Sequence, residues 1–158
     1  MGSSIDVDIR GVNEAIGEIR HMTMRVEGAV REVVATAAVT GHRMAVKAVQ
    51  GKAKDTGALS KSIQWQITND GFSAQIRTRS KYAEPTEFGR RPGARMPPAS
   101  ALVGWSRRKI GDGRLAFVVA RSIGEKGLPE RPFMRPGATI VAATMKRDVG
   151  KIRAAAEG

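Results

Sequence analysis

The sequence predicts an α+β domain with a long N-terminal helix, a small antiparallel sheet built on a β-hairpin, and further helices that include a C-terminal one. Three patterns carry this prediction. Apolar residues recur at helical spacing through residues 12–49, and no proline interrupts them. Two alternating segments, 62–68 and 72–78, flank an Asn-Asp-Gly turn, which is typical of a hairpin. A second helical pattern covers residues 138–156. We expect the whole chain to form one domain, because 158 residues suffice for a single core.

The first expected element is a short strand, in which Ile5, Val7 and Ile9 alternate with polar residues. The long helix then begins at about Val12 and carries charged residues on the face opposite its apolar one. Its apolar positions are Ile16, Ile19, Val26, Val30, Val33, Val34, Ala37, Ala38, Met44 and Val49. Two glycines inside it are expected to weaken it by about 1 kcal/mol each, and either can mark a bend. They are Gly28 and Gly41.

The hairpin is expected to turn one apolar face inward. Its inner residues would be Ile63, Trp65 and Ile67 on one strand and Phe72, Ala74 and Ile76 on the other. Residues 82–88 are expected to be extended around their proline. Residues 89–98, rich in Arg, Gly and Pro, are expected to form an exposed loop that orders only against a partner. Short helices are expected at residues 99–110 and 115–124, and residues 131–137 are expected to form an extended link to the last helix.

Composition limits the kinds of function. The net charge of +12 arises from 27 Lys and Arg against 15 Asp and Glu, which favours polyanionic partners such as nucleic acid or acidic protein surfaces. The absence of cysteine excludes disulfides and thiolate chemistry, and two histidines are too few for a multi-His metal site. No apolar run approaches the roughly 20 residues of a membrane span. We therefore expect a protein made in the cytoplasm, with no cofactor, no metal and no membrane contact.

Nine basic residues are candidates for contact with DNA or an acidic partner. Three are expected to alternate along one face of the second strand, three lie in the loop that follows, and three lie on the short helix after it. They are Arg77, Arg79 and Lys81, then Arg90, Arg91 and Arg95, then Arg107, Arg108 and Lys109. Phosphate contacts of this kind carry no sequence information. No helix-turn-helix, zinc-finger or stacking-aromatic pattern indicates base readout. A solvated face with interface salt bridges is the other interpretation.

One pair of acidic residues permits an enzymatic hypothesis. Glu84 and Glu87 are three positions apart, so that a turn would bring their carboxylates close enough to share a proton or hold a metal. The simpler expectation is that one forms a salt bridge at a subunit interface and the other is solvated. No other catalytic constellation accompanies the pair, and the sequence favours a protein that is not an enzyme.

Three motifs follow one another along the chain: DTGALSKSI at residues 55–63, YAEPTEFG at 82–89 and RPFMRPGA at 131–138. We expect their residues to keep the fold or to meet neighbouring subunits, with Asp55 capping a turn and Glu87 beside an apolar anchor, Phe88, at a strand end. Two prolines would stiffen the link that places Phe133. The candidate residues are Asp55, Thr56, Gly57, Leu59, Tyr82, Glu87, Phe88, Gly89, Arg131, Pro132, Phe133, Arg135 and Pro136.

In this order, with a long helix before and a helix after them, the motifs resemble the neck and tail-completion family of long-tailed bacteriophages. That family includes head–tail joining and tail-component proteins and is similar to the minor tail protein Z of lambda-like phages. The resemblance covers the chain from about residue 12 onward. One departure is Gly137, which separates Pro136 from the usual small residue at Ala138 and is expected to have little consequence.

The resemblance implies a structural subunit of the head–tail junction in the virion, and not an enzyme. It implies a ring of identical copies, expected to be hexameric, in contact with connector or stopper proteins and with tail-tube proteins, through which DNA passes. The family alone does not separate a neck protein from a tail terminator. The alternative function is a basic DNA-binding module without catalytic activity.

Overall fold

The computed structural model describes residues 11–52 and 55–157; the strand expected near residues 5–9 lies outside these ranges. The elements are α1 (Val12–Lys52), α2 (Ala58–Ser62), β1 (Ile63–Thr68), η1 (Asn69–Gly71), β2 (Ser73–Thr78), α3 (Ala83–Phe88), α4 (Ala99–Ile110), η2 (Gly113–Leu115), α5 (Ala116–Lys126) and α6 (Met134–Glu157). The prediction of an α+β fold with a long N-terminal helix, a β-hairpin and a C-terminal helix is confirmed. None of the described helices is long and apolar enough to cross a membrane.

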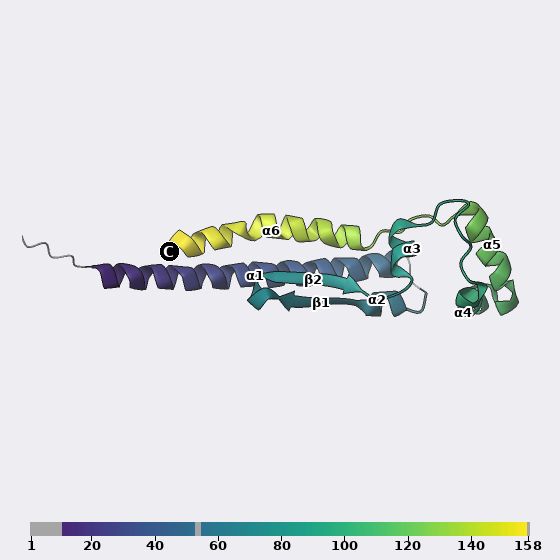
Figure 1. Ribbon diagram of the computed structural model, residues 1–158, viewed down its shortest axis with the longest axis horizontal. Helices are drawn as coiled ribbons and strands as arrows, with labels where there is room; N and C mark the ends of the chain where they lie inside the picture. The colour runs from purple at the N-terminus through teal and green to yellow at the C-terminus, as the bar shows by residue number, and fades with distance from the viewer. Residues whose placement is uncertain (1–10, 53–54, 158) are drawn as a thin grey trace, which may run out of the picture.

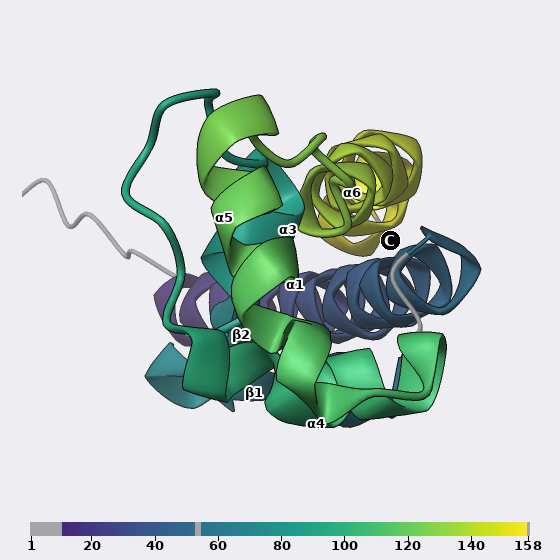
Figure 2. The same ribbon diagram turned by 90° about the vertical axis from the view of Figure 1, so that its right-hand side faces the viewer.

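The described chain is elongated, with α1 along most of its length (Figure 1). α6 runs back along one side of α1, and the hairpin packs along another (Figures 1 and 2). α4 and α5 form the end of the molecule that lies away from the beginning of α1 (Figure 1). The two ends are therefore built from different elements, and the core lies between them.

Small residues let α1 and α6 approach closely. A Cβ on Gly41 would overlap Val141 of α6 and lie 2.8 Å from Ile76 Cδ1 of the hairpin. A Cβ on Gly137 would lie 3.0 Å from the carbonyl oxygen of Gly41. Gly41 therefore marks a close contact inside an unbroken helix. Gly137 is also buried, and the close approach of the α1 backbone favours glycine there.

The hairpin has the predicted inner face. Its antiparallel register pairs Trp65 with Ile76 and Ile67 with Ala74, which places these side chains on one side of the sheet. Ile63 is buried there, whereas Trp65 and Ile67 remain exposed in the single chain. Phe72 lies just before β2, and the guanidinium carbon of Arg31 is 4.8 Å from its ring centre. The sheet has only these two strands among the described residues, and a lone hairpin is marginally stable in water.

Two stretches expected to be extended are helical. Residues 82–88 contain α3, and α6 begins at Met134 instead of Ala138. The prolines that suggested extended backbone, Pro85 and Pro136, both fall in the first turn of a helix. A proline is tolerated in that turn because its missing N–H would have no partner within the helix.

The loop at residues 89–98 is exposed as predicted, but its own chain holds it in place. Arg90 and Leu128 exchange backbone hydrogen bonds of 2.8 and 2.9 Å, and the N–H of Gly93 donates to the Gly124 carbonyl over 2.8 Å. The expectation that only a partner would order this loop is therefore wrong. The loop attaches the start of α4 to the end of α5.

The two short helices predicted after this loop are present, the second shifted slightly toward the C-terminus. α4 and α5 pack against each other around η2, where the buried Ser106 hydroxyl donates to the Asp112 carbonyl over 2.8 Å. Ala116 and Ala120 of α5 are also buried. We call residues 99–126 the α4–α5 unit.

Candidate assembly interface

The three sequence motifs meet at one place along α1. Leu59 of the first motif and Phe133 of the third lie in one buried cluster, together with Ala45 and Val49 of α1 and Ile63 of β1. Phe133 is fully buried. The motifs are therefore brought together by the fold, although they are separated along the chain.

Glu87 of the second motif caps the helix that begins in the third. One carboxylate oxygen accepts hydrogen bonds from the backbone N–H groups of Phe133 (2.6 Å) and Met134 (2.8 Å), and the other accepts from Arg135 (3.1 Å). These N–H groups have no partner within α6, and the helix dipole favours a negative charge at this end. Glu87 is therefore a fold-keeping residue, and it is almost completely buried.

The expected arrangement of Glu87 and Phe88 is reversed. We expected Phe88 to be the anchor at the end of a strand, but Phe88 ends the short helix α3 and is 65% exposed. The Arg135 guanidinium carbon lies 5.7 Å from its ring centre. Arg135 also forms a salt bridge of 2.9 Å with Glu130. Phe88 is therefore available to a neighbouring molecule, while Glu87 is not.

The rest of the second and third motifs fixes the path of the chain around this cap. Gly89 has a φ of +68°, and a Cβ there would lie 2.8 Å from the backbone nitrogen of Glu130. The N–H of Arg131 donates to the Thr86 carbonyl over 2.8 Å. Pro132 then leads directly into the buried Phe133. These contacts leave only glycine room at position 89.

The first motif connects the body to the α4–α5 unit. Contrary to expectation, no backbone N–H of the described residues caps onto Asp55; its carboxylate receives two hydrogen bonds from the Arg108 guanidinium of α4. The hydrogen bond from Arg108 lowers the pKa of Asp55 below its usual value. Thr56 takes the capping role, because its hydroxyl oxygen accepts from the N–H of Ala58 over 3.3 Å. Gly57 has a φ of +78° just before α2.

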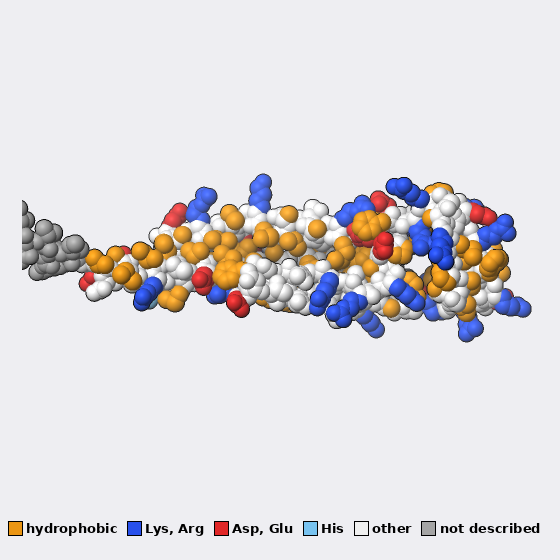
Figure 3. All heavy atoms as spheres, viewed as in Figure 1, with side chains coloured by type: hydrophobic (Ala, Val, Ile, Leu, Met, Phe, Trp, Pro, Cys, Tyr) orange, Lys and Arg blue, Asp and Glu red, His pale blue; other side chains and the backbone are white. Residues whose placement is uncertain are grey.

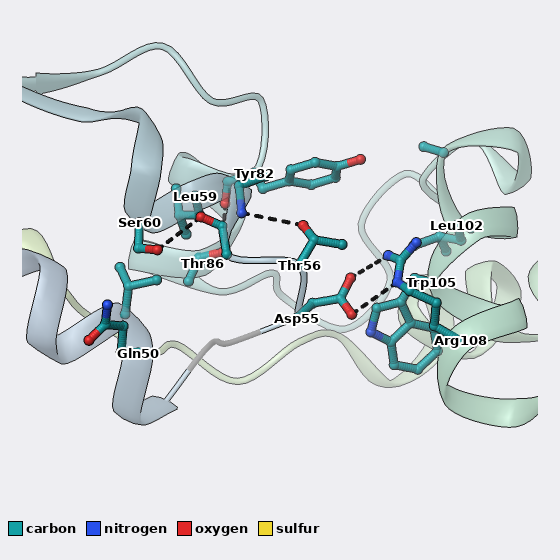
Figure 4. Close-up of a pocket in the computed structure, with 15 residues that line it drawn as sticks. Gln50, Asp55, Thr56, Leu59, Ser60, Tyr82, Thr86, Leu102, Trp105 and Arg108 are labelled. Atoms are coloured by element: carbon teal, nitrogen blue, oxygen red, sulfur yellow. Dashed lines mark hydrogen bonds and ion pairs between the residues drawn. The ribbon is translucent and has the colours of Figure 1, made fainter.

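A pocket of about 460 Å³ lies between this motif and α4. Figure 4 shows Asp55 reaching Arg108 across it, with Trp105 on the α4 side and Tyr82 on the side of the body. Tyr82 is exposed beside the pocket. Most of the surface that lines the pocket is apolar. It fits an apolar side chain better than a charged substrate.

The enzymatic hypothesis receives no support from the carboxylates. Both oxygens of Glu87 accept backbone hydrogen bonds, and Glu84 is exposed one turn earlier on α3. Among the described residues, no group of three His, Cys, Asp or Glu side chains is placed to hold a metal ion. The residues of this region are arranged for packing and connection.

The predicted basic face is less regular than expected. β2 ends at Thr78, so Arg77 lies on the strand, whereas Arg79 and Lys81 follow it and do not alternate along one face. Arg77 donates to Gln66 on β1, and Lys81 lies 5.3 Å from the Tyr82 ring centre. The remaining six residues lie in the loop and on α4. Arg90 donates to the Arg95 carbonyl, and Arg108 binds Asp55. The exposed ones include Arg91, Arg95, Arg107 and Lys109.

Positive charge is concentrated toward one end of the molecule. Residues 77–114 contain ten Lys and Arg against three Asp and Glu, whereas residues 12–52 contain six against four. Figure 3 shows most of the basic side chains over the half that carries α3, α4 and α5. The molecule is therefore electrically asymmetric along its length.

Large apolar side chains are exposed at both ends, on the hairpin and along α6. The exposed residues include Val12, Ile16, Ile19 and Met24 of α1, Trp65 and Ile67 of β1, Phe117 and Val118 of α5, and Met145 and Val149 of α6. Extensive exposed apolar surface is typical of proteins that bind other proteins. Sequence reasoning missed the α5 pair. The signal was the run Ala-Phe-Val-Val at residues 116–119. Four consecutive apolar residues point to all sides of a helix, so a helix packed on one face leaves some of them exposed.

No family model, no curated protein and no solved structure matches this chain.

Proposed function

We propose that this protein is a structural subunit of the head–tail junction of a long-tailed phage, which assembles with copies of itself into a ring. The observation that carries the proposal is the exposure of large apolar side chains at both ends and on the hairpin of an elongated chain with a small core. Such side chains are stabilised when neighbouring molecules cover them. The resemblance of the three motifs to the neck and tail-completion family suggests that the assembly is a ring at the head–tail junction.

The ring would be hexameric, as the resemblance implies, and would contact connector or stopper proteins on one side and tail-tube proteins on the other. Basic residues that neighbouring copies leave uncovered would face the DNA that passes through it or an acidic neighbouring protein. DNA that must move is served best by weak contacts spread over many residues, since phosphate contacts are non-specific and screened by salt. In this proposal the protein has no catalytic role.

The alternative is a basic module that binds DNA as a single chain. The observation that favours it is the excess of Lys and Arg in residues 77–114, on exposed loops and α4. Such a module would bind DNA without assembling, and its affinity would fall steeply with salt.

The test combines light scattering and electron microscopy of the purified protein with genetics. The proposal expects closed rings above a threshold concentration, and a phage with the gene inactivated should accumulate heads and tails that do not join. A protein that stays monomeric at high concentration, is absent from virions and shifts DNA in a gel would overturn the proposal in favour of the DNA-binding module.

A further inference from the structure

α1 extends past the end of its packing partner. Arg25 of α1 donates to the Ala155 carbonyl near the end of α6 over 3.3 Å, and Glu32 forms a salt bridge of 3.0 Å with Lys151. The two helices are therefore antiparallel, and the described part of α6 ends at Glu157. The earlier residues of α1, 12–24, project beyond it (Figure 1). We call residues 12–24 the α1 tip.

The apolar stripe that α1 uses against its own chain continues along the tip. Positions 12, 16, 19, 23, 26, 30 and 33 follow the alternating steps of four and three that keep side chains on one face of a helix, and all but Thr23 are Val or Ile. Val33 on this stripe is 2% exposed, whereas Ile19 is 58% exposed. A short helix without packing is marginal in water, so the tip is stabilised when something covers this stripe.

A second exposed apolar surface lies at the opposite end of the molecule. On α5, Phe117 is 56% and Val118 is 60% exposed, and Ile110 and Leu115 are exposed nearby in sequence. Figure 3 shows apolar and basic side chains interspersed over this end. The α4–α5 unit therefore offers an apolar surface bordered by positive charge.

The two ends are complementary in charge. The α1 tip contains Glu14 and Glu18 against Arg20 alone, whereas residues 99–126 contain six Lys and Arg against two Asp and Glu. Arg107 and Lys109 of α4 form no salt bridge with any described residue. Two basic α4–α5 units repel each other, whereas an α1 tip with a small acidic excess attracts an α4–α5 unit.

We propose that the α1 tip of one copy docks on the α4–α5 unit of the next, so that the copies join head to tail. The proposal rests on the proposed function and names the contact within the ring. A contact between two different surfaces generates a closed ring when the rotation between neighbours closes. It also accounts for the exposed apolar residues of both ends with one interface.

The test uses the absence of native cysteine, which makes introduced thiols unambiguous. The variants Ile16→Cys and Val118→Cys change exposed positions and should fold normally, which circular dichroism confirms. After treatment with a short bismaleimide, a mixture of the two should give a dimer that contains one chain of each. The double variant should give a ladder of oligomers. The matched control pairs Ile16→Cys with Ala142→Cys, an exposed position on α6, and should give neither product.

Charge reversal provides a second readout. Glu14→Lys with Glu18→Lys should lower the rate of crosslinking about tenfold at low salt, and Arg107→Glu with Lys109→Glu on the other chain should restore it. Crosslinking of Ile16→Cys to itself would overturn the proposal, because tips would then meet tips. Rings that form without the mixed crosslink would overturn this contact and leave the proposed function standing. A monomer in every condition would overturn both.

Discussion

Side chains play opposite parts in two regions of the molecule. One region is the joint where Glu87 of α3 caps the start of α6, and the other is the pair of ends. At the joint, a buried carboxylate and a fully buried phenylalanine satisfy needs of the same chain, since Glu87 caps α6 and Phe133 fills the core. At the ends, Ile19 and Phe117 make large apolar surfaces that the chain does not cover. The comparison teaches that the buried motif residues hold the subunit together, whereas the apolar residues at its ends add little to its own core.

The largest expected effect comes from breaking the joint. Glu87→Ala removes the acceptor of three backbone N–H groups at a buried helix end, and we expect a loss of about 3–5 kcal/mol in the free energy of unfolding. Glu87→Gln keeps an acceptor and should lose about 1–2 kcal/mol. Urea denaturation measures both. The control is Glu84→Ala, exposed on the same helix, which should change stability by less than about 0.5 kcal/mol. Equal losses at positions 84 and 87 would contradict the capping role.

The next effect concerns the close contact of α1 with α6. Gly41→Ala places a methyl group against Val141 and Ile76 and should destabilise the protein by about 1–3 kcal/mol. Gly28→Ala, on the same helix, meets no atom within 4 Å and should stabilise it by about 1 kcal/mol. Thermal unfolding of the two variants should therefore shift in opposite directions. A stabilising Gly41→Ala would show that the helices separate easily.

A smaller effect is expected where the body meets the α4–α5 unit. Asp55→Asn removes the ion pair with Arg108 and should cost less than about 1 kcal/mol of global stability, but it should speed hydrogen exchange in α4 and α5. The pKa of Asp55 is lowered in the folded chain. The ionised carboxylate therefore stabilises the fold fully when the pH is above the ordinary Asp pKa near 4. The contribution is lost as the pH falls through the lowered pKa.

The control for this variant is Arg121→Gln, which breaks a pair with Glu125 inside α5. It should leave exchange in α4 unchanged. Unchanged exchange in Asp55→Asn would mean that packing alone holds the unit to the body.

The smallest effect on stability is expected from the basic residues after the hairpin. Replacing Arg77, Arg79 and Lys81 together by Gln should leave the fold intact, because exposed charges contribute about 0–1 kcal/mol each. If these residues line the channel, rings should form but DNA retention or ejection should fail. If they lie between rings, heads and tails should not join. Normal phage yield and infectivity would show that this basic face is only solvated.

The sequence by itself determined the elements whose signals are local. The long helix, the hairpin and α4 were predicted because their apolar spacing and turn residues act within a few positions of one another. The motif residues were singled out as a group, and the fold brings Leu59, Glu87 and Phe133 together. The individual roles of these residues were not predicted. The sequence does not reveal that Asp55 lies beside Arg108 or that Glu87 lies beside Phe133.

Only the tertiary structure decided the rest. Pro85 and Pro136 suggested extended chain, but α6 begins four residues early because Glu87, distant in sequence, satisfies its first N–H groups. The tight packing at Gly137 arises from the approach of a second helix, which leaves no pattern along the chain. The exposure of the apolar residues on the α1 tip likewise depends on how far α6 extends along α1. Helical spacing predicts which residues share a face but not the length of the helix that covers them.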